Sequence, residues 1–150
     1  FELGATERIG FVFPIHSWGI PPLVVQFIEK LQISNHAQPS VFVMFTCGDE
    51  CGHADRQMHD LLAKKGWATR HIYSVQMPNN YIMFPGFDVD AKPLEEQKKA
   101  DAKRLLPQLI ESIKKDLPIA HYHRGSLPYL KSRLIYPQFC KHMMTSKSFW

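Results

Sequence analysis

Apolar residues form three short runs in the first half of the chain. The runs span residues 8–14, 41–48 and 67–78, and the first two are apolar at nearly every position. Consecutive apolar residues are typical of a strand buried on both faces of a parallel sheet. The third run alternates more, which predicts a strand nearer the sheet edge.

Two amphipathic segments separate these runs and predict helices. The first begins after Pro21 and spans residues 22–33, and the second spans residues 53–66, where Gly66 stands in the position of a left-handed cap. One face of the first helix repeats at four-residue spacing: Leu23, Phe27 and Leu31, with Val24 and Ile28 beside them. The order strand–helix–strand–helix–strand makes two right-handed crossover units, so we expect an α/β fold with a parallel sheet and helices on both faces.

The second half of the chain predicts one long helix and little else. Residues 77–93 form a loop rich in turn residues, of the kind that often carries function. A helix is expected from about 93 to 117, with Pro107 inside it as a point of kinking or restarting. Residues 118–150 contain a short helical patch and no clear strand.

The edges of such a sheet raise a separate question. Residues 9–13 are too hydrophobic for an edge strand, because soluble proteins avoid long apolar edges. Either a further strand precedes Phe1, or a partner chain covers this edge. The chain begins with Phe1 rather than Met, so we expect it to continue upstream.

Composition bounds the class of protein. At 150 residues, the chain is expected to form one domain, 1–150. Its apolar runs are far shorter than the roughly 20 residues that span a bilayer, so no membrane partner is expected. The formal charge is +4, but the lysines of 92–117 alternate with acids as on a solvated helix face, which argues against nucleic acid. Three cysteines make no disulfide framework and favour the cytoplasm.

Candidate chemistry follows each strand, where open parallel sheets bind ligands. The segments are "PIHSWGIPP", "TCGDECGHAD" and "MPNNYI". Trp18 offers a flat face for a planar ring. Gly48 and Gly52 allow backbone N–H groups to approach a ligand. The segment after the third strand adds amide donors and a second aromatic ring.

These three motifs, in this order, resemble the flavodoxin-like domain at the N-terminus of ferredoxin-fused flavodoxins. The resemblance covers about residues 8–85 and implies a flavodoxin-like three-layer sandwich that binds FMN. In this resemblance, the "HSWG" turn flanks one face of the flavin and "TCGDECG" meets its pyrimidine edge. The cofactor-binding residues that it implies are Pro14, His16, Ser17, Trp18, Gly19, Thr46, Cys47, Gly48, Asp49, Gly52, Asn79, Asn80 and Tyr81. It implies neither a catalytic residue nor a metal ligand.

The same resemblance implies what lies beyond the chain. The family's Ser/Thr-Gly-rich phosphate loop has no counterpart in these residues, so it and the first strand are expected upstream. The ending "SKSFW" resembles the stretch before the cluster-binding cysteines of the family. A ferredoxin-type iron–sulfur domain, with its clusters, is therefore expected downstream in the same full-length chain. Whether the chain forms a homo-oligomer stays open.

The expected function is an FMN-binding electron-transfer domain that passes electrons to or from the iron–sulfur partner. The alternatives are a flavin-dependent NAD(P)H oxidoreductase, with substrate over "NNYIMFPGF", and a non-redox interaction module that has lost its cofactor.

Single residues also have other interpretations. Trp18 could be a loop-packing aromatic, and His16 could be a surface residue or a cation that favours the reduced flavin. Cys47 and Cys51 could be a redox-active pair or, with a histidine nearby, metal ligands, although their spacing fits no zinc-knuckle pattern. The histidines of "AHYHRG" are expected in a solvent-exposed turn.

Overall fold

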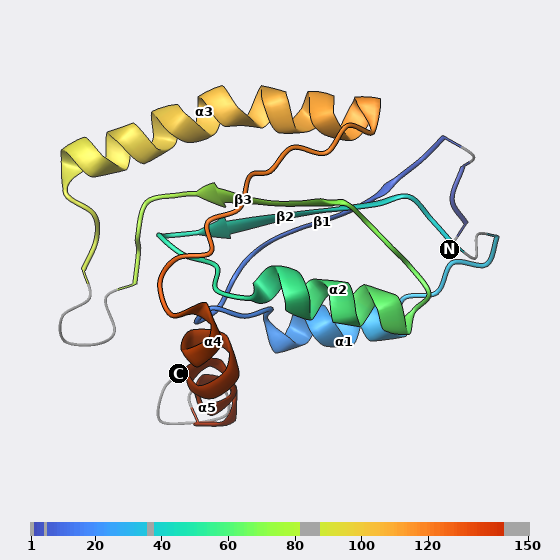
Figure 1. Ribbon diagram of the computed structural model, residues 1–150, viewed down its shortest axis with the longest axis horizontal. Helices are drawn as coiled ribbons and strands as arrows, with labels where there is room; N and C mark the ends of the chain where they lie inside the picture. Colours follow the sequence, from blue (N-terminus) through green and yellow to red (C-terminus); the bar gives the residue numbers. More distant parts are fainter. Residues whose placement is uncertain (1, 5, 36–37, 82–87, 143–150) are drawn as a thin grey trace.

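The computed structural model describes the chain except for residues 1, 5, 36–37, 82–87 and 143–150. Its centre is a three-stranded parallel sheet in the order β1-β2-β3 (Figure 1). The strands are β1 (Ile9–Pro14), β2 (Val41–Cys47) and β3 (His71–Gln76). Three parallel strands in sequence order, alternating with helices, confirm the α/β fold and correspond to a flavodoxin-like or Rossmann-like sandwich.

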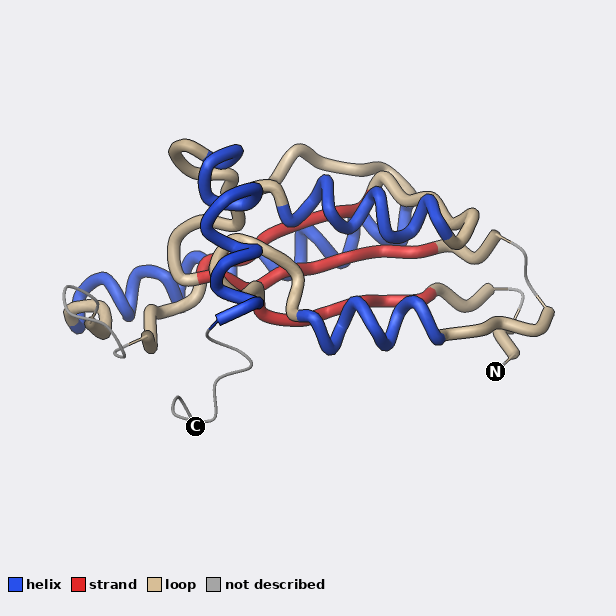
Figure 2. Tube along the Cα trace, turned by 90° about the horizontal axis from the view of Figure 1, so that it is seen from below, coloured by secondary structure: helices blue, strands red, loops and turns tan. Residues whose placement is uncertain are grey.

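Helices cover both faces of this sheet, as expected. Strands in sequence order with right-handed crossovers place both connecting helices on one face. These are α1 (Pro22–Lys30) and α2 (Ala54–Lys64), and α3 (Lys92–Lys115) lies on the other face (Figure 1). The chain then returns to the carboxyl ends of the strands. There it forms α4 (Pro128–Leu130), the π-helical turn η1 (Lys131–Ile135) and α5 (Tyr136–His142) (Figure 2).

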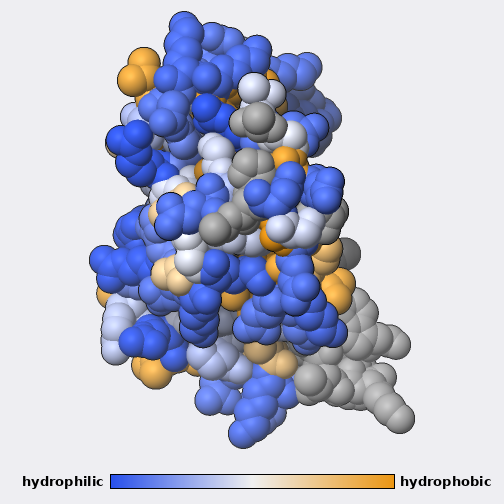
Figure 3. Space-filling model, turned by 90° about the vertical axis from the view of Figure 1, so that its right-hand side faces the viewer, coloured by the Kyte–Doolittle hydropathy of each residue, from blue (hydrophilic) through white to orange (hydrophobic). Residues whose placement is uncertain are grey.

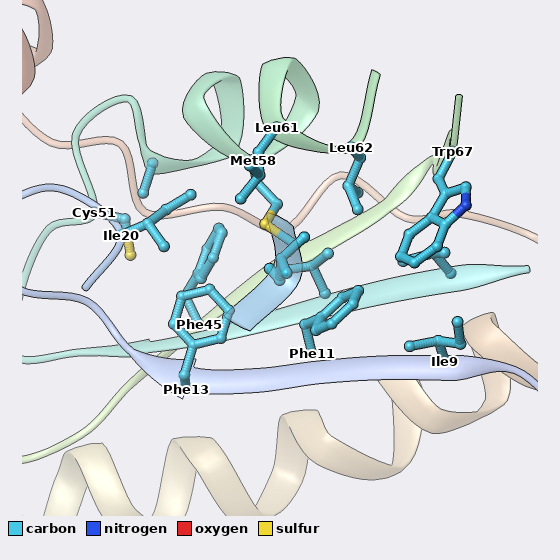
Figure 4. Close-up of a cluster of buried hydrophobic side chains, with 14 of the residues drawn as sticks. Ile9, Phe11, Phe13, Ile20, Phe45, Cys51, Met58, Leu61, Leu62 and Trp67 are labelled. Atoms are coloured by element: carbon cyan, nitrogen blue, oxygen red, sulfur yellow. The ribbon is translucent and has the colours of Figure 1, made fainter. Parts of the chain in front are cut away.

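The main core lies between the sheet and the α1–α2 layer (Figure 4). Every second residue of β1 points into it, and Phe13 meets Phe45 of β2 edge to face, with 5.2 Å between the ring centroids. Met58 and Leu62 of α2 cover this core on the side away from the sheet, and both side chains are at most 1% exposed. A smaller cluster fills the space between β2, β3 and α3.

The prediction that β1 is buried on both faces is wrong. Its residues alternate between buried and exposed, and the Val12 side chain is exposed. The reason is that α3 packs over β2 and β3 but leaves β1 uncovered. Gly10 is covered instead by the Phe42 ring of β2, which lies 2.2 Å from where a Cβ would stand.

The two edges of the sheet differ. Hydrogen bonds from Ile9 and Ile15 N–H groups to the β2 side show that the odd residues of β1 face β2. The peptide groups of Gly10 and Val12 therefore point outward, and no hydrogen bond to them is found in the part of the chain that the structure describes. At the other edge, the outward N–H of Ser74 in β3 donates to the His121 carbonyl at 3.3 Å. The β3 edge is thus covered by the chain itself, and the β1 edge is open.

The apolar stripe of α1 lies elsewhere than predicted. Leu23 and Phe27 are exposed, whereas Ile28 is buried and Val24 and Leu31 pack against the core as expected. Because Leu31 is already extended backbone beyond the last helical residue, the helix is shorter than the four-residue repeat suggested. The exposed pair lies on the α1 face turned away from the core.

Two predictions for the other helices can be compared directly. Gly66 follows α2 with a φ of 71°, which confirms the left-handed cap. Helix α3 continues through Pro107 as a single element, with the proline on its exposed side. No described helix has the length and apolar composition needed to cross a bilayer.

Candidate functional site

The turn after β1 is held in an uncommon conformation. His16 and Gly19 exchange two backbone hydrogen bonds, of 2.9 and 3.0 Å, around Ser17 and Trp18. These two residues have φ values of 45° and 64°, the left-handed region required of both central residues in a type I′ turn. Non-glycine residues pay about 1–2 kcal/mol each for this conformation, so the surroundings must hold the turn in place.

This turn lies against the loop that follows β2. A Cβ placed on Gly52 would stand 2.9 Å from the Trp18 Cβ. The two loops therefore meet at one end of the sheet, as the parallel strands predict. Trp18 is half-buried there, with the Lys131 ammonium 5.3 Å from its ring centroid.

The loop after β3 is joined to the same end by a charged network. The Asn79 amide donates to Asp49 at 2.8 Å and to Asp90 at 3.1 Å. Lys98 of α3 reaches the same two carboxylates, at 2.9 and 2.6 Å. A Cβ on Gly48 would stand only 1.7 Å from the Asn79 Oδ1, so the loops after β2 and β3 are in close contact.

Electrostatics stabilise this network in its charged form. Burial alone would lower the pKa of Lys98, but its hydrogen bonds to Asp90 and Asp49 outweigh burial and raise it. The hydrogen bond from Lys98 is also the main cause of the lowered pKa of Asp90. Sequence reasoning missed both residues, because a lysine among acids reads as part of a solvated helix face.

The amino end of α2 is capped by the C-terminal segment of the chain. His53 precedes the helix without making a side-chain cap. Instead, the Gly52 N–H donates to the Arg124 carbonyl at 3.1 Å, and the His53 N–H donates to the Ser132 Oγ at 2.8 Å. The Asp55 N–H donates to the Tyr122 hydroxyl at 3.0 Å. Helix amino ends often hold anions with such amides, but these already have partners within the protein.

Ion pairs fasten the same segment. Arg124 forms a forked pair with Asp55, with contacts of 3.1 and 2.5 Å. Glu50 binds the Lys131 ammonium and accepts a hydrogen bond of 3.0 Å from the Ser126 N–H. Because these contacts join residues about 70 to 80 positions apart, they fix the tail over the strand ends (Figure 2).

The glycines test whether these loops fit a flavin. At Gly19 the Tyr136 ring lies 2.4 Å from where a Cβ would stand, and at Gly52 the Ser132 Oγ lies at the same distance. At Gly48 the space is taken by Asn79. The space beside each of these glycines is thus filled by a side chain of the protein itself. This space and the amides of residues 51–53, which already have partners, therefore do not fit a planar ring. The turn at 16–18 differs, because its Trp18 side chain is only half-buried.

The remaining predicted residues are scattered around this centre. Thr46 and His16 are half-buried near it, Pro14 is the exposed last residue of β1, and Asn80 is exposed. Burial lowers the pKa of His16, which favours its neutral imidazole. Tyr81 is half-buried at the last described position before the gap at 82–87. The substrate segment predicted over "NNYIMFPGF" lies mostly in this gap, outside the described residues.

The two cysteines of the β2 loop are buried thiols. The neighbouring Cys47 is the main cause of the raised pKa of Cys51, followed by burial. A thiol that stays protonated is a poor nucleophile and a poor metal ligand. Within the described ranges, no three His, Cys, Asp or Glu residues gather to hold a metal ion.

The prediction of a solvent-exposed turn around "AHYHRG" is wrong. His121 and His123 are half-buried, and their rings meet with 4.9 Å between centroids. The His123 ring contacts the Ser74 Oγ at 2.9 Å, and the His121 Nε2 is buried without a hydrogen-bond partner among the described residues. The segment runs along the β3 edge because that edge offers unpaired peptide groups.

A hollow of about 390 Å³ lies at the opposite end of the sheet, between Ser40, Thr69 and Asp116. His71 links it to the α3 core, with Nε2 2.6 Å from Asp116 and Nδ1 2.7 Å from the Tyr73 hydroxyl. This end of the molecule is largely hydrophilic, with separated apolar side chains (Figure 3). The polar groups of His71 and Asp116 beside this hollow bind other groups of the protein, so they offer little that would bind a ligand.

We expect Asp116→Asn to change the pH dependence of stability. The hydrogen bond from His71 is the main cause of the lowered pKa of Asp116, and Arg70 and Arg8 add to it. A lowered folded-state pKa adds stability above the unfolded value of about 4, and this stability is lost as the pH falls further. In urea denaturation, the variant should be less stable than wild type at pH 7, and the difference should shrink below pH 4.

The control for this prediction is Asp101→Asn, which removes an exposed pair with Arg104 on α3. Such a pair contributes little to stability, so the control should follow wild type at every pH. A constant difference between Asp116→Asn and wild type from pH 7 to pH 3 would contradict the prediction.

Comparisons with known proteins add no further assignment. No protein-family model, curated protein or solved structure matches the chain. What is defined is the class of the domain: an α/β fold with three parallel strands in the order 1-2-3. At their carboxyl ends, the loop after β2 contacts the loop after β1 and the loop after β3.

Proposed function

We propose that the domain binds FMN at the carboxyl ends of β1 and β2 and passes electrons to or from an iron–sulfur partner. The observation that supports this proposal is the contact between the turn at 16–19 and the loop at 46–52, where Trp18 lies against Gly52. Cofactors of α/β sheets bind at this end. The motifs in these loops, in chain order, add the resemblance to ferredoxin-fused flavodoxins.

The residues of the β1 turn would hold the flavin. The Trp18 ring would stack against one face of it and keep water away, while its neutral neighbour His16 would add no charge. When bound, FMN supplies the one- and two-electron chemistry, and the protein sets its position and solvent access. The space beside Gly19, Gly48 and Gly52 would not contribute to flavin binding, because side chains of the protein itself fill it.

The phosphate group of FMN would be bound by a further segment that pairs with the open β1 edge of the sheet. The outward peptide groups of Gly10 and Val12 are suited to pair with one more strand, and Pro14 marks where pairing ends because it lacks an N–H. Leu23 and Phe27 are exposed on α1, in the helical layer that covers one face of the sheet. The added segment would cover these two side chains as well. We propose that this strand comes from upstream in the full-length chain and that the phosphate loop is attached to it. The iron–sulfur domain would follow downstream.

A second candidate is an interaction module without a cofactor. It is favoured by the amides of residues 51–53, which already have partners in the C-terminal segment. A flavin site in use would be expected to leave some of these donors available.

Titration of the full-length protein with FMN tests the first proposal. We expect flavin fluorescence to be quenched on binding, and Trp18→Leu to weaken binding about two- to tenfold, since stacking is worth about 0.5–1.5 kcal/mol. The matched control is Trp67→Phe, because Trp67 is buried in the core and capped by Lys65. It should leave the dissociation constant unchanged. Absence of quenching would favour the interaction module, and equal binding by Trp18→Leu would refute the assigned site.

A further inference from the structure

The turn that carries Trp18 needs support from outside itself. Ser17 and Trp18 both have left-handed backbone conformations, with φ values of 45° and 64°. Residues with a Cβ adopt this conformation at an energetic cost, so their surroundings must favour it. The groups that fix this turn therefore also fix the position of the indole ring.

Two consecutive residues of η1, Lys131 and Ser132, contact Trp18. The buried Ser132 hydroxyl donates to the Trp18 carbonyl at 2.8 Å and so holds the backbone of the turn. The Lys131 ammonium lies over the Trp18 ring, 5.3 Å from the ring centroid. Short π-helical turns are rare and are frequent at functional sites. The C-terminal segment thus holds both the backbone and the side chain of Trp18.

Lys131 is itself held in place. Its side chain is only 18% exposed, and its ammonium forms an ion pair with Glu50 of the β2 loop. The same ammonium donates to the Ser126 Oγ at 3.1 Å. A cation is attracted to the face of an indole ring, and the attraction is stronger where both groups are partly removed from water. The contact between Lys131 and Trp18 is therefore a fixed part of this end of the sheet.

We propose that Lys131 is a positioning residue for Trp18 and that a flavin stacks on the ring face opposite to the ammonium. This inference rests on the proposed function. The ammonium excludes a planar ligand from the face that it covers, so the isoalloxazine ring has only the other face to stack on. A side chain already held in its bound orientation loses little freedom on binding, which improves affinity. In this arrangement Lys131 acts on the flavin through Trp18 alone.

The alternative is that Lys131 only fastens the C-terminal segment to the protein. Other contacts fasten the same segment: the forked pair of Arg124 with Asp55 and the two hydrogen bonds of Ser132. These contacts remain when the ammonium is removed. Its removal should therefore free the Trp18 ring and leave the segment in place, which distinguishes the two roles.

NMR of the ¹⁵N-labelled, cofactor-free 150-residue chain tests the positioning. We expect the Trp18 indole N–H to have a heteronuclear NOE as high as that of the buried Trp67, and a lower one in Lys131→Met. The backbone amides of 127–142 should keep their wild-type values. Lys131→Arg keeps a cation over the ring and should restore the Trp18 value. Lys65→Met is the matched control, because it removes an ammonium 5.1 Å from the Trp67 ring centroid and should leave Trp18 unchanged.

Titration of the full-length protein with FMN tests the consequence for binding. Lys131→Met should weaken binding about two- to fivefold, the loss expected for one cation–π contact. Lys131→Arg and Lys65→Met should bind FMN as wild type does. With ¹³C-labelled lysine, the ring current of Trp18 should shift the Lys131 ε-CH₂ signal upfield. This shift should persist when FMN binds, because the ammonium and the flavin occupy opposite faces of the ring.

The contrary results are distinct from one another. An unchanged Trp18 NOE in Lys131→Met, or a loss of order throughout 127–142, would show that Lys131 does not position the ring. Equal FMN binding by wild type and Lys131→Met would refute its role in flavin binding, and loss of the upfield shift would place the flavin on the lysine side. If wild type binds no FMN, the proposed function fails, whereas the NOE, measured without flavin, still decides whether Lys131 orders Trp18.

Discussion

Replacing Gly52 with alanine should lower the free energy of unfolding by about 2–4 kcal/mol. The residue has a φ of 57°, which an L-amino acid adopts at a cost of about 1–2 kcal/mol. The new methyl group would also stand 2.4 Å from the Ser132 Oγ and 2.9 Å from the Trp18 Cβ. One substitution would thus strain the β1 turn, the β2 loop and the C-terminal segment together. Urea denaturation at pH 7 measures the loss.

Gly66→Ala is the control that separates backbone strain from crowding. Gly66 has a φ of 71°, but nothing lies within 4 Å of the position its Cβ would take. Its substitution should therefore cost only the backbone share, about 1 kcal/mol. Equal losses for the two alanine variants would mean that the three segments do not meet at Gly52.

The second large effect is expected at Tyr122. Its ring packs against the main core and meets Phe45 edge to face, with 6.2 Å between centroids, while its hydroxyl caps α2 through the Asp55 N–H. Tyr122→Ala should lower the free energy of unfolding by about 2–4 kcal/mol. Tyr122→Phe keeps the ring and should cost about 1 kcal/mol for the lost hydrogen bond.

Tyr129→Ala is the matched control, since Tyr129 belongs to the same tail but its ring is exposed. Its stability should stay within about 0.5 kcal/mol of wild type. A Tyr122→Ala variant as stable as this control would show that the tail is not part of the core in solution. The proposed capping of α2 would then be wrong.

The sheet was predictable because its signals are local. Buried strands and the helices between them leave periodic patterns, and Gly66 marks the end of α2 by its own backbone freedom. The burial of β1 was not predictable from the same pattern. Val12 is exposed because α3 packs over β2 and β3 rather than over β1. The sequence around Val12 does not indicate over which strands α3 packs.

The site was predictable only in outline. Parallel strands bring the segments after them to one end of the sheet, so the contact between the turn of Trp18 and the loop of Gly52 followed from topology. That Ser132 and Tyr136 fill the space beside Gly52 and Gly19 did not follow, because each lies 80 or more positions along the chain from the glycine that it contacts. A glycine that makes room for a ligand and one that makes room for a tyrosine look alike in a sequence.

The capping of α2 from the far end of the chain has a consequence for biosynthesis. When residues up to 116 have left the ribosome, all three strands and α2 are complete, but the partners of the Gly52, His53 and Asp55 amides have yet to emerge. Contacts of such long sequence separation slow folding. The nascent domain therefore reaches its final form only after Ser132 leaves the exit tunnel.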